Sequence, residues 1–105
     1  MTDRLNQLLK MHEDDPADTF LTYGIAIEHA NAENFGEAIN WLNKTLTIDP
    51  LYCYAYFQKA KAYSELGEDT DAKAAIEAGI NAAIKAGDDH ARSELTDLLS
   101  TLDLE

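Results

Sequence analysis

The sequence predicts an all-α fold in which antiparallel helical hairpins stack on one another, and an internal repeat is the main reason. Two Asp-Pro pairs, at residues 15–16 and 49–50, define a 34-residue offset. Residues of matching size and polarity recur at the same offset: Phe20 with Tyr54, Tyr23 with Phe57, Ala26 with Ala60, Ala38 with Ala72, Leu42 with Ile76 and Leu46 with Ile80. A 34-residue period is typical of one helix-turn-helix unit in a stacked array.

Length and composition predict a single domain, residues 1–105, with a core of its own. The one cysteine, Cys53, excludes an internal disulfide framework. Residues 1–15 lack the uninterrupted apolar segment of a signal peptide, and no apolar run approaches the roughly 20 residues of a membrane span. We therefore expect a soluble protein in a reducing, cytoplasmic setting.

The charge of the chain excludes two classes of partner. Twenty acidic side chains against eight basic ones give a net charge of −12. Such a surface repels nucleic acid and anionic lipid over about a Debye length, so neither is an expected partner. Two interpretations of the charge stay open: it keeps the protein soluble, or it steers a basic partner toward the surface.

Residues 1–16 are predicted to form half a repeat. Thr2 or Asp3 can cap a helix that runs to about His12. Its apolar residues follow helical spacing and comprise Leu5, Leu8, Leu9 and Met11. Leu8 precedes Leu42 by the repeat offset, so this helix is in register with the second helix of the following unit.

Residues 17–50 are predicted to form the first full repeat. Its first helix runs from Ala17 to about Asn31, with Asp18 or Thr19 near its start, and its second covers 35–48. The second helix ends before residues 49–50 because proline disfavours helical geometry in the preceding residue. Gly24 costs up to ~1 kcal/mol inside a helix relative to alanine, and we expect a neighbouring backbone to approach closely there.

Residues 51–86 are predicted to form the second full repeat, and 87–105 a capping helix. The helices of the second repeat cover 51–66 and about 70–86, with Gly67 as a C-cap. Ile84 stands where the first repeat has Pro50, so the second helix continues to Ala86 before Gly87 closes it. The last helix is capped by Asp88 or Asp89 and has one apolar and one charged face, as the end of a stack requires.

The chain resembles the tetratricopeptide repeat (TPR) family, as a small stand-alone TPR domain. The residues that carry the resemblance are Ala26, Ala38, Leu42 and Pro50 in the first repeat and Tyr56, Ala60, Tyr63, Gly67, Ala72 and Ile76 in the second. The resemblance covers residues 1–86 and implies a short right-handed solenoid with a C-terminal capping helix. Thr22, His29, Lys59 and Ile84 depart from the family's preferences, and His29, which Tyr63 matches one repeat later, is interpreted as a packing residue with satisfied hydrogen bonds.

The resemblance implies a protein-interaction module. In TPR proteins, set positions of the first helix in each repeat line a concave groove. Carried over, these positions are Phe20, Tyr23, Ile27, Ala30 and Asn31, then Tyr54, Phe57, Lys61, Ser64 and Glu65. The partner-binding residues that we predict are Phe20, Tyr23, Ile27, Asn31, Tyr54, Phe57 and Lys61. An aromatic-lined surface suits an apolar, basic or amphipathic peptide or helix of a partner protein.

Other interpretations of these residues stay open. The aromatic rings can be covered in part by the terminal helices or pack on one another. A homodimer that uses the same groove, or the exposed end of the stack, is the alternative function. A clamp for a C-terminal carboxylate is disfavoured, because this groove offers only Lys61 and Asn31 as donors, with Glu65 opposing them.

No pattern predicts an enzyme. The three histidines lie in different predicted helices, without a metal-binding spacing such as H-E-x-x-H. No nucleophile elbow or P-loop occurs, and the acidic turns lack the ligand order of a calcium loop. We therefore predict a non-enzymatic protein with no catalytic residues, no metal and no cofactor.

Overall fold

The computed structural model describes residues 3–103, which form six α-helices and no strand. In chain order the helices are α1 (Asp3–Asp14), α2 (Thr19–Asn31), α3 (Phe35–Ile48), α4 (Cys53–Glu65), α5 (Asp69–Ala86) and α6 (Asp89–Asp103). The prediction of an all-α fold built from helical hairpins is confirmed. The predicted bounds of α3 and the C-terminal end of α5 agree with the structure, whereas α1 extends two residues beyond His12.

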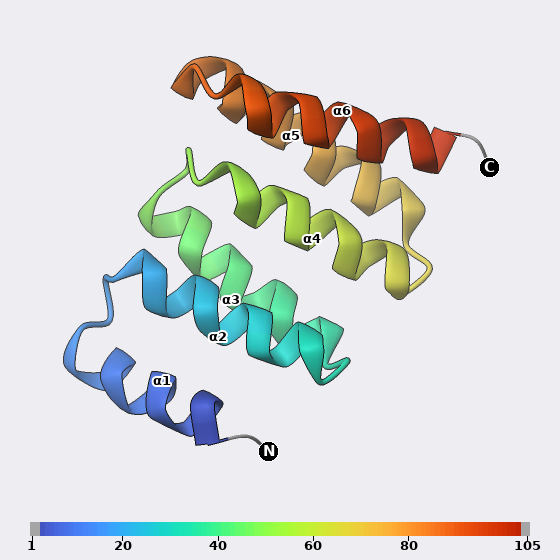
Figure 1. Cartoon of the computed structure of the whole chain (residues 1–105). Helices are drawn as coiled ribbons and strands as arrows, with labels where there is room; N and C mark the ends of the chain where they lie inside the picture. Colours follow the sequence, from blue (N-terminus) through green and yellow to red (C-terminus); the bar gives the residue numbers. More distant parts are fainter. Residues whose placement is uncertain (1–2, 104–105) are drawn as a thin grey trace.

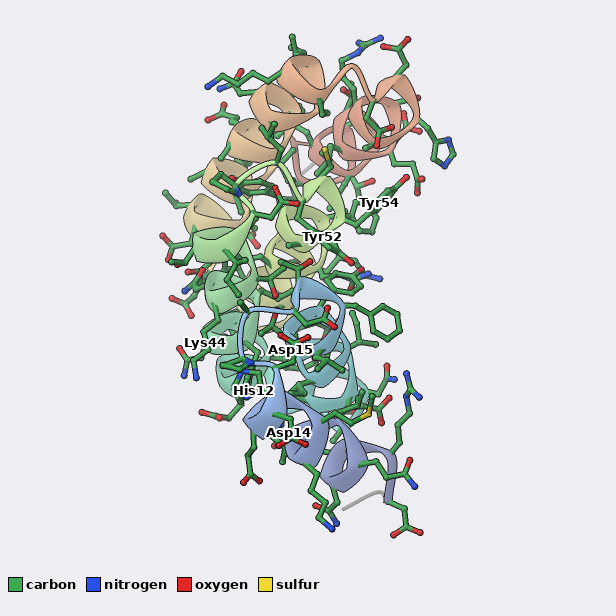
Figure 2. All side chains as sticks on the ribbon, turned by 90° about the vertical axis from the view of Figure 1, so that its left-hand side faces the viewer. His12, Asp14, Asp15, Lys44, Tyr52 and Tyr54 are labelled. Atoms are coloured by element: carbon green, nitrogen blue, oxygen red, sulfur yellow. The ribbon has the colours of Figure 1, made fainter. Side chains whose placement is uncertain are left out.

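The helices form two layers within an elongated molecule of 40 × 29 × 18 Å. In Figure 1, α2, α4 and α6 lie in the nearer layer, and α3 and α5 lie behind them. Each helix packs mainly on the helices that precede and follow it in the chain, and α4 also contacts α2 and α6. Seen from the edge in Figure 2, Tyr54 lies on the side of the α2–α4–α6 layer, and Lys44 points outward from the opposite side.

An aspartate caps the start of α2, and left-handed residues follow the ends of α2 and α4. Asp18 caps α2, since its carboxylate accepts a hydrogen bond of 2.9 Å from the N–H of Phe20. After α2 and α4 the chain reverses through residues with positive φ, Glu33 (62°) and Gly67 (76°), which are equivalent positions of the two repeats. The repeat thus places a glutamate, in a conformation that favours glycine, where the second repeat has the glycine itself.

The small and aliphatic residues that match at the repeat offset lie in the core. The paired alanines at positions 26 and 60, and those at 38 and 72, are at most 1% exposed. Leu42 and Ile76, which pair at the same offset, are also buried. Leu42 packs with Ala26 of α2 and Ala55 of α4, so the core continues from one hairpin to the next. Residues that match at the 34-residue offset therefore make equivalent packing contacts in the two repeats.

Helix α1 closes one end of this core. Leu5 and Leu8 of α1 pack on Leu21 and Ile25 of α2. Trp41 of α3 joins them, with the His12 ring edge-on at 5.0 Å between centroids and the Lys44 ammonium 4.1 Å from the indole centroid. The imidazole and the ammonium both contact the indole, so they add polar groups to this end of the apolar cluster.

Two of the glycines inside helices, Gly24 and Gly79, lie in different surroundings. A Cβ added to Gly24 would meet the side chain of Leu8 at 3.5 Å, an ordinary contact. The expected close backbone approach at Gly24 is therefore wrong. At Gly79 in α5 an added Cβ would lie 2.7 Å from Cβ of Tyr56 and 3.1 Å from a Leu95 methyl group, so the close approach occurs there instead.

Two buried threonines replace that close contact in the first repeat. Thr22 and Thr45 are the first-repeat equivalents of Tyr56 and Gly79, and they are 1% and 0% exposed. Their hydroxyl oxygens lie 2.7 Å apart. Each hydroxyl can also donate to a carbonyl of its own helix, to Thr19 at 3.2 Å or to Trp41 at 3.0 Å. The two hydroxyls have only two protons for these three contacts. At any moment one threonine therefore donates to the other threonine and makes no hydrogen bond to the carbonyl of its own helix.

We expect Thr22→Val and Thr45→Val each to lower the free energy of unfolding by about 1 kcal/mol, because each removes one buried hydrogen bond. The double variant is expected to lose less than the sum, since no hydroxyl is then left without its partner. Urea denaturation of the wild type, the two single variants and the double variant measures the coupling energy between the two hydroxyls, provided that the free energy of unfolding depends on urea concentration with the same slope in all four. Strictly additive losses would show that the two hydroxyls do not interact.

Candidate functional site

Two hollows flank the outer side of α4. The α2–α4 hollow, of about 300 Å³, is lined by Ala30, Asn31, Glu33, Phe35, Gln58, Lys61, Ala62 and Glu65. The α4–α6 hollow, of about 220 Å³, is lined by Phe57, Glu94, Asp97, Leu98 and Thr101. Phe57 and Lys61 lie one helical turn apart on α4 and line one hollow each, so they separate the two. This face of the α2–α4–α6 layer is the candidate site.

The predicted partner-binding residues differ in how open they are. Asn31 and Lys61 come together in the α2–α4 hollow, and Phe57 lines the other. Phe20 at the start of α2 is 65% exposed, the highest value for a large hydrophobic side chain within residues 3–103. Ile27 is half-buried. Of these five, Phe20 is therefore the apolar side chain most accessible to a partner.

Tyr23 packs against the protein itself. Its ring lies 5.0 Å from that of Tyr52, at an interplanar angle of 33°, and joins α2 to the segment that precedes α4. Burial raises the pKa of Tyr23, partly offset by a hydrogen bond with Gln58. Burial likewise raises the pKa of Tyr52. The interpretation that some rings pack on one another therefore applies to Tyr23, which offers only part of its surface to a partner.

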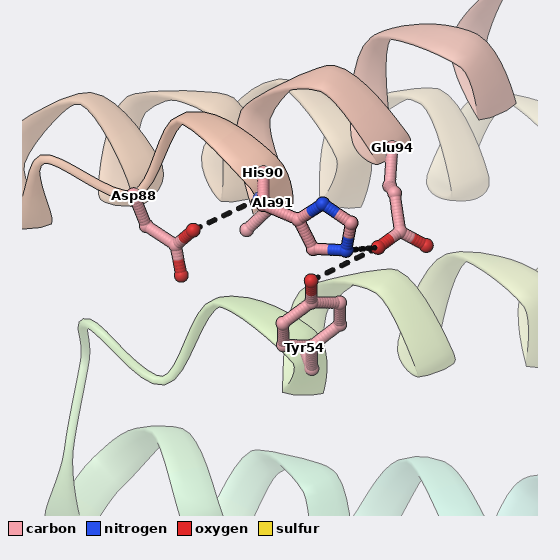
Figure 3. Close-up of polar contacts among 5 residues, drawn as sticks. All are labelled: Tyr54, Asp88, His90, Ala91 and Glu94. Carbon is pink, nitrogen blue, oxygen red and sulfur yellow. Dashed lines mark hydrogen bonds and ion pairs between the residues drawn. The ribbon is translucent and has the colours of Figure 1, made fainter.

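Tyr54 links α4 to α6 through a shared carboxylate (Figure 3). Its hydroxyl donates to Oε1 of Glu94 at 3.0 Å, and Nε2 of His90 lies 2.6 Å from the same oxygen. Partial burial, the hydrogen bond to Glu94 and the charge of that group raise the pKa of Tyr54 to about 12. The phenol therefore stays a neutral donor, and this contact holds one wall of the α4–α6 hollow.

Phe57 lies at the centre of the candidate site. Its ring is 6.4 Å from that of Tyr54, edge-on, and it packs beside the core cluster that contains Leu95. The Lys61 ammonium lies 5.5 Å from the Phe57 ring centroid. At that distance the face of the ring attracts a cation, and Lys61 itself is exposed. The ring of Phe57, which attracts cations, thus lies between the two hollows.

The α6 residues of the site were missed by the sequence prediction. The capping helix was expected to present its charged face to solvent, and Asp97 and Thr101 are exposed; together with Glu94 they also line a hollow against α4, which was not expected. A shift in register explains the omission: α2 and α4 begin at equivalent positions of the repeat, but α6 begins two residues later than a third repeat would place it. With this shift Lys61 corresponds to Asp97 and Glu65 to Thr101, which are groove positions. The absence of proline at Ile84 was the signal in the sequence.

Two polar side chains that depart from the family pattern, Lys59 and His29, are half-buried. Lys59 lies in a hollow on the side of α4 that faces α5, together with Asp71, and burial lowers the pKa of its amine. Nδ1 of His29 is buried and has no hydrogen-bond partner within residues 3–103. The prediction of a satisfied histidine is therefore wrong for this atom.

Other reactive groups do not add to the site. Cys53 is buried, its thiol donates to the carbonyl of Leu51 at 3.3 Å, and burial raises the pKa of the thiol, which makes it a poor nucleophile. No three His, Cys, Asp or Glu side chains of residues 3–103 are placed to hold a metal ion. Within residues 3–103, no helix is both long enough and apolar enough to cross a bilayer.

Comparisons with known proteins identify the family. No family model and no curated protein matches the chain in sequence. Among solved structures, a protein from Bordetella parapertussis is 27% identical, with a TM-score of 0.86 over 98% of this chain and 90% of that one. The TPR2B domain of yeast Sti1, in a complex with pHsp70, is 23% identical, with a TM-score of 0.89 over 95% and 80% of the two chains, and shows the fold alone.

A solved tetratricopeptide repeat domain protein from Salinibacter ruber is similar in sequence as well as in fold. It is 31% identical, with a TM-score of 0.78 over 84% of this chain and 89% of that one. This identity over most of both chains agrees with the 34-residue register and with the hairpins of the structure. The chain belongs to the tetratricopeptide repeat family.

Proposed function

We propose that this protein is an interaction module that holds a short segment of a partner protein against the face formed by α2, α4 and α6. The two hollows on either side of Phe57 and Lys61 carry the proposal, because they offer a segment two places to insert side chains. The Sti1 domain with this fold was solved in a complex with pHsp70, which supports a protein as partner. The residues that we assign to the contact are Phe20, Tyr23, Ile27, Asn31, Tyr54, Phe57 and Lys61.

The exposed apolar side chain of Phe20 gives the sharpest test. Peptides are selected from a random display library on the intact protein, synthesised, and measured by isothermal titration. We expect Phe20→Ala to weaken their binding about tenfold or more, because an aromatic anchor in an interface contributes about 2 kcal/mol. Since Phe20 is 65% exposed, the substitution is expected to leave the fold intact, which circular dichroism checks.

Ile84 provides the matched control. It is 60% exposed, close to the value for Phe20, but it belongs to α5 in the opposite layer. Ile84→Ala should therefore leave peptide binding unchanged. Equal losses in both variants would indicate non-specific apolar binding, and unchanged binding in both would exclude this face as the site.

Self-association is the second candidate, and sedimentation equilibrium separates it from the first. A partner segment needs the face of α2, α4 and α6 to be free, so we expect one species at the monomer mass of 11.6 kDa over a wide concentration range. A stable dimer that Phe20→Ala dissociates would instead place a second copy on this face.

A further inference from the structure

We propose that the α4–α6 hollow receives an arginine side chain of the bound segment. The hollow is formed by Phe57 on one side and by Glu94, Asp97, Leu98 and Thr101 on the other. This proposal rests on the proposed function, because it assigns one part of the candidate site to one side chain of the partner. It goes beyond that function by naming the chemistry that this part recognises.

The lining of the hollow combines apolar side chains, Phe57 and Leu98, with the carboxylates of Glu94 and Asp97. Glu94, Asp97 and Thr101 follow one another at steps of three and four residues, so they share one side of α6. Leu95, on the other side of the helix, is 1% exposed and packs on α4 and α5. Because that core contact fixes the rotation of α6, both carboxylates are held beside the hollow.

The two carboxylates have different partners. Oε1 of Glu94 is held by the Tyr54 hydroxyl and by His90, an arrangement drawn in Figure 3. The side chain of Asp97 is exposed, and within the part of the chain that the structure describes it has neither an ion pair nor a hydrogen bond. Within that same part no basic side chain lines the hollow. Asp97 is therefore available to a cation supplied by a partner.

The combination of groups favours arginine among the cations of a protein. A guanidinium is planar, stacks on an aromatic face such as that of Phe57, and donates two parallel hydrogen bonds to a carboxylate. Lys61 already places an ammonium 5.5 Å from the Phe57 centroid, so a cation can approach this ring. The net charge of −12 favours the approach of a basic segment.

A small probe tests the hollow without any knowledge of the partner. The full chain, labelled with ¹⁵N, is titrated with N-acetylarginine methylamide and, separately, with the citrulline analogue, which has the same shape but no charge. We expect saturable shifts of the Phe57, Leu98 and Thr101 amide signals with the arginine compound, and binding about tenfold weaker with citrulline. Equal shifts with both compounds, or none with either, would overturn the proposal.

Variants locate the effect. Asp97→Asn should weaken binding of the arginine compound about tenfold, because it removes the unpaired carboxylate and keeps the shape of the side chain. Glu77→Gln, at an exposed position of α5, removes the same charge from the opposite layer and should have no effect. Unchanged binding in Asp97→Asn would place the arginine elsewhere. Equal losses in both variants would indicate a general attraction to an acidic surface.

The selected peptides separate this proposal from the proposed function. Peptides that bind this face should contain arginine. Replacing that arginine by citrulline should weaken binding to the wild-type protein but should not weaken binding to Asp97→Asn any further. If Phe20→Ala weakens the peptides while Asp97→Asn does not, the binding face stands and the arginine pocket is excluded. If no peptide depends on Phe20, the proposed function fails, and the titration with the arginine compound still decides the chemistry of the hollow.

Discussion

Replacing Gly79 by alanine is expected to lower the free energy of unfolding by about 3 kcal/mol, although alanine is the better helix former by about 1 kcal/mol. The added Cβ would lie 2.7 Å from Cβ of Tyr56, an atom fixed to the backbone of α4, and 3.1 Å and 3.2 Å from the two terminal methyl groups of Leu95. A side chain can rotate away, but Cβ of Tyr56 cannot move without α4. Helices α4 and α5 must therefore separate, and the contacts between them weaken. Chemical denaturation measures the loss.

The same substitution at Gly24 is the control. Gly24 also lies inside a helix, but an added Cβ would meet only Leu8 methyl groups, at 3.5 Å and 3.7 Å. Gly24→Ala should therefore be neutral, or stabilise the protein by about 0.5–1 kcal/mol through the lower entropy of the unfolded chain. A loss at Gly24 as large as that at Gly79 would mean that the glycines act through something other than the distance between α4 and α5.

Leu95→Ala is expected to lower the free energy of unfolding by about 3 kcal/mol. Leu95 is 1% exposed and is part of the core cluster that joins α4, α5 and α6, with Ala60 and Ile76 among its members. Truncation leaves a cavity at the junction of three helices, which the backbone can fill only in part. Thermal or urea denaturation followed by circular dichroism measures the change.

Leu66→Ala serves as the matched control for Leu95→Ala. Leu66 follows α4, is 46% exposed, and should change stability by no more than about 0.5 kcal/mol. If Leu95→Ala also has little effect, α6 is an appendage rather than part of the folded unit, and it cannot hold the wall of the α4–α6 hollow. The methyl groups of Leu95 lie beside the position that an added Cβ of Gly79 would occupy. The losses of unfolding free energy from Gly79→Ala and Leu95→Ala should therefore not be additive.

The core of this protein was accessible to sequence reasoning because the same packing contact occurs twice. The alanines at 26 and 60 and the large residues Leu42 and Ile76 occupy equivalent places, and all four are buried. At buried positions, a match in size and polarity at a fixed offset indicates that the surroundings also repeat. The repeat therefore predicted both the hairpins and the residues between them.

Distances between helices were not accessible in the same way. Gly24 and Gly79 look alike in sequence, since each interrupts a helix, yet only Gly79 lies at a close approach. The approach depends on how Tyr56, Gly79 and Leu95 fit together, and these residues come from three helices. In the first repeat the threonines at 22 and 45 meet through their hydroxyls instead. Which residues of neighbouring helices meet, and how closely, becomes visible only when the helices are positioned relative to one another.

The candidate site was predicted in part. The register assigned Asn31, Phe57 and Lys61 to one surface, and each of them lines one of the two hollows. It did not predict that Tyr23 stacks on Tyr52, because Tyr52 lies outside the repeated positions. It also left out the side of α6 that carries Asp97, since the longer α5 and the shorter connection after it shift the register by two residues.

The packing of each helix mainly on its chain neighbours also has a kinetic consequence. Few contacts join distant parts of the sequence, so the chain closes only short loops as it folds, and folding is expected to be fast for a protein of this length. Folding can begin at either hairpin, α2–α3 or α4–α5, because the contacts of both are local, and the other helices then add to it. Helix α1, which packs on α2 at one end of the stack, can open and reclose while the remaining helices stay folded.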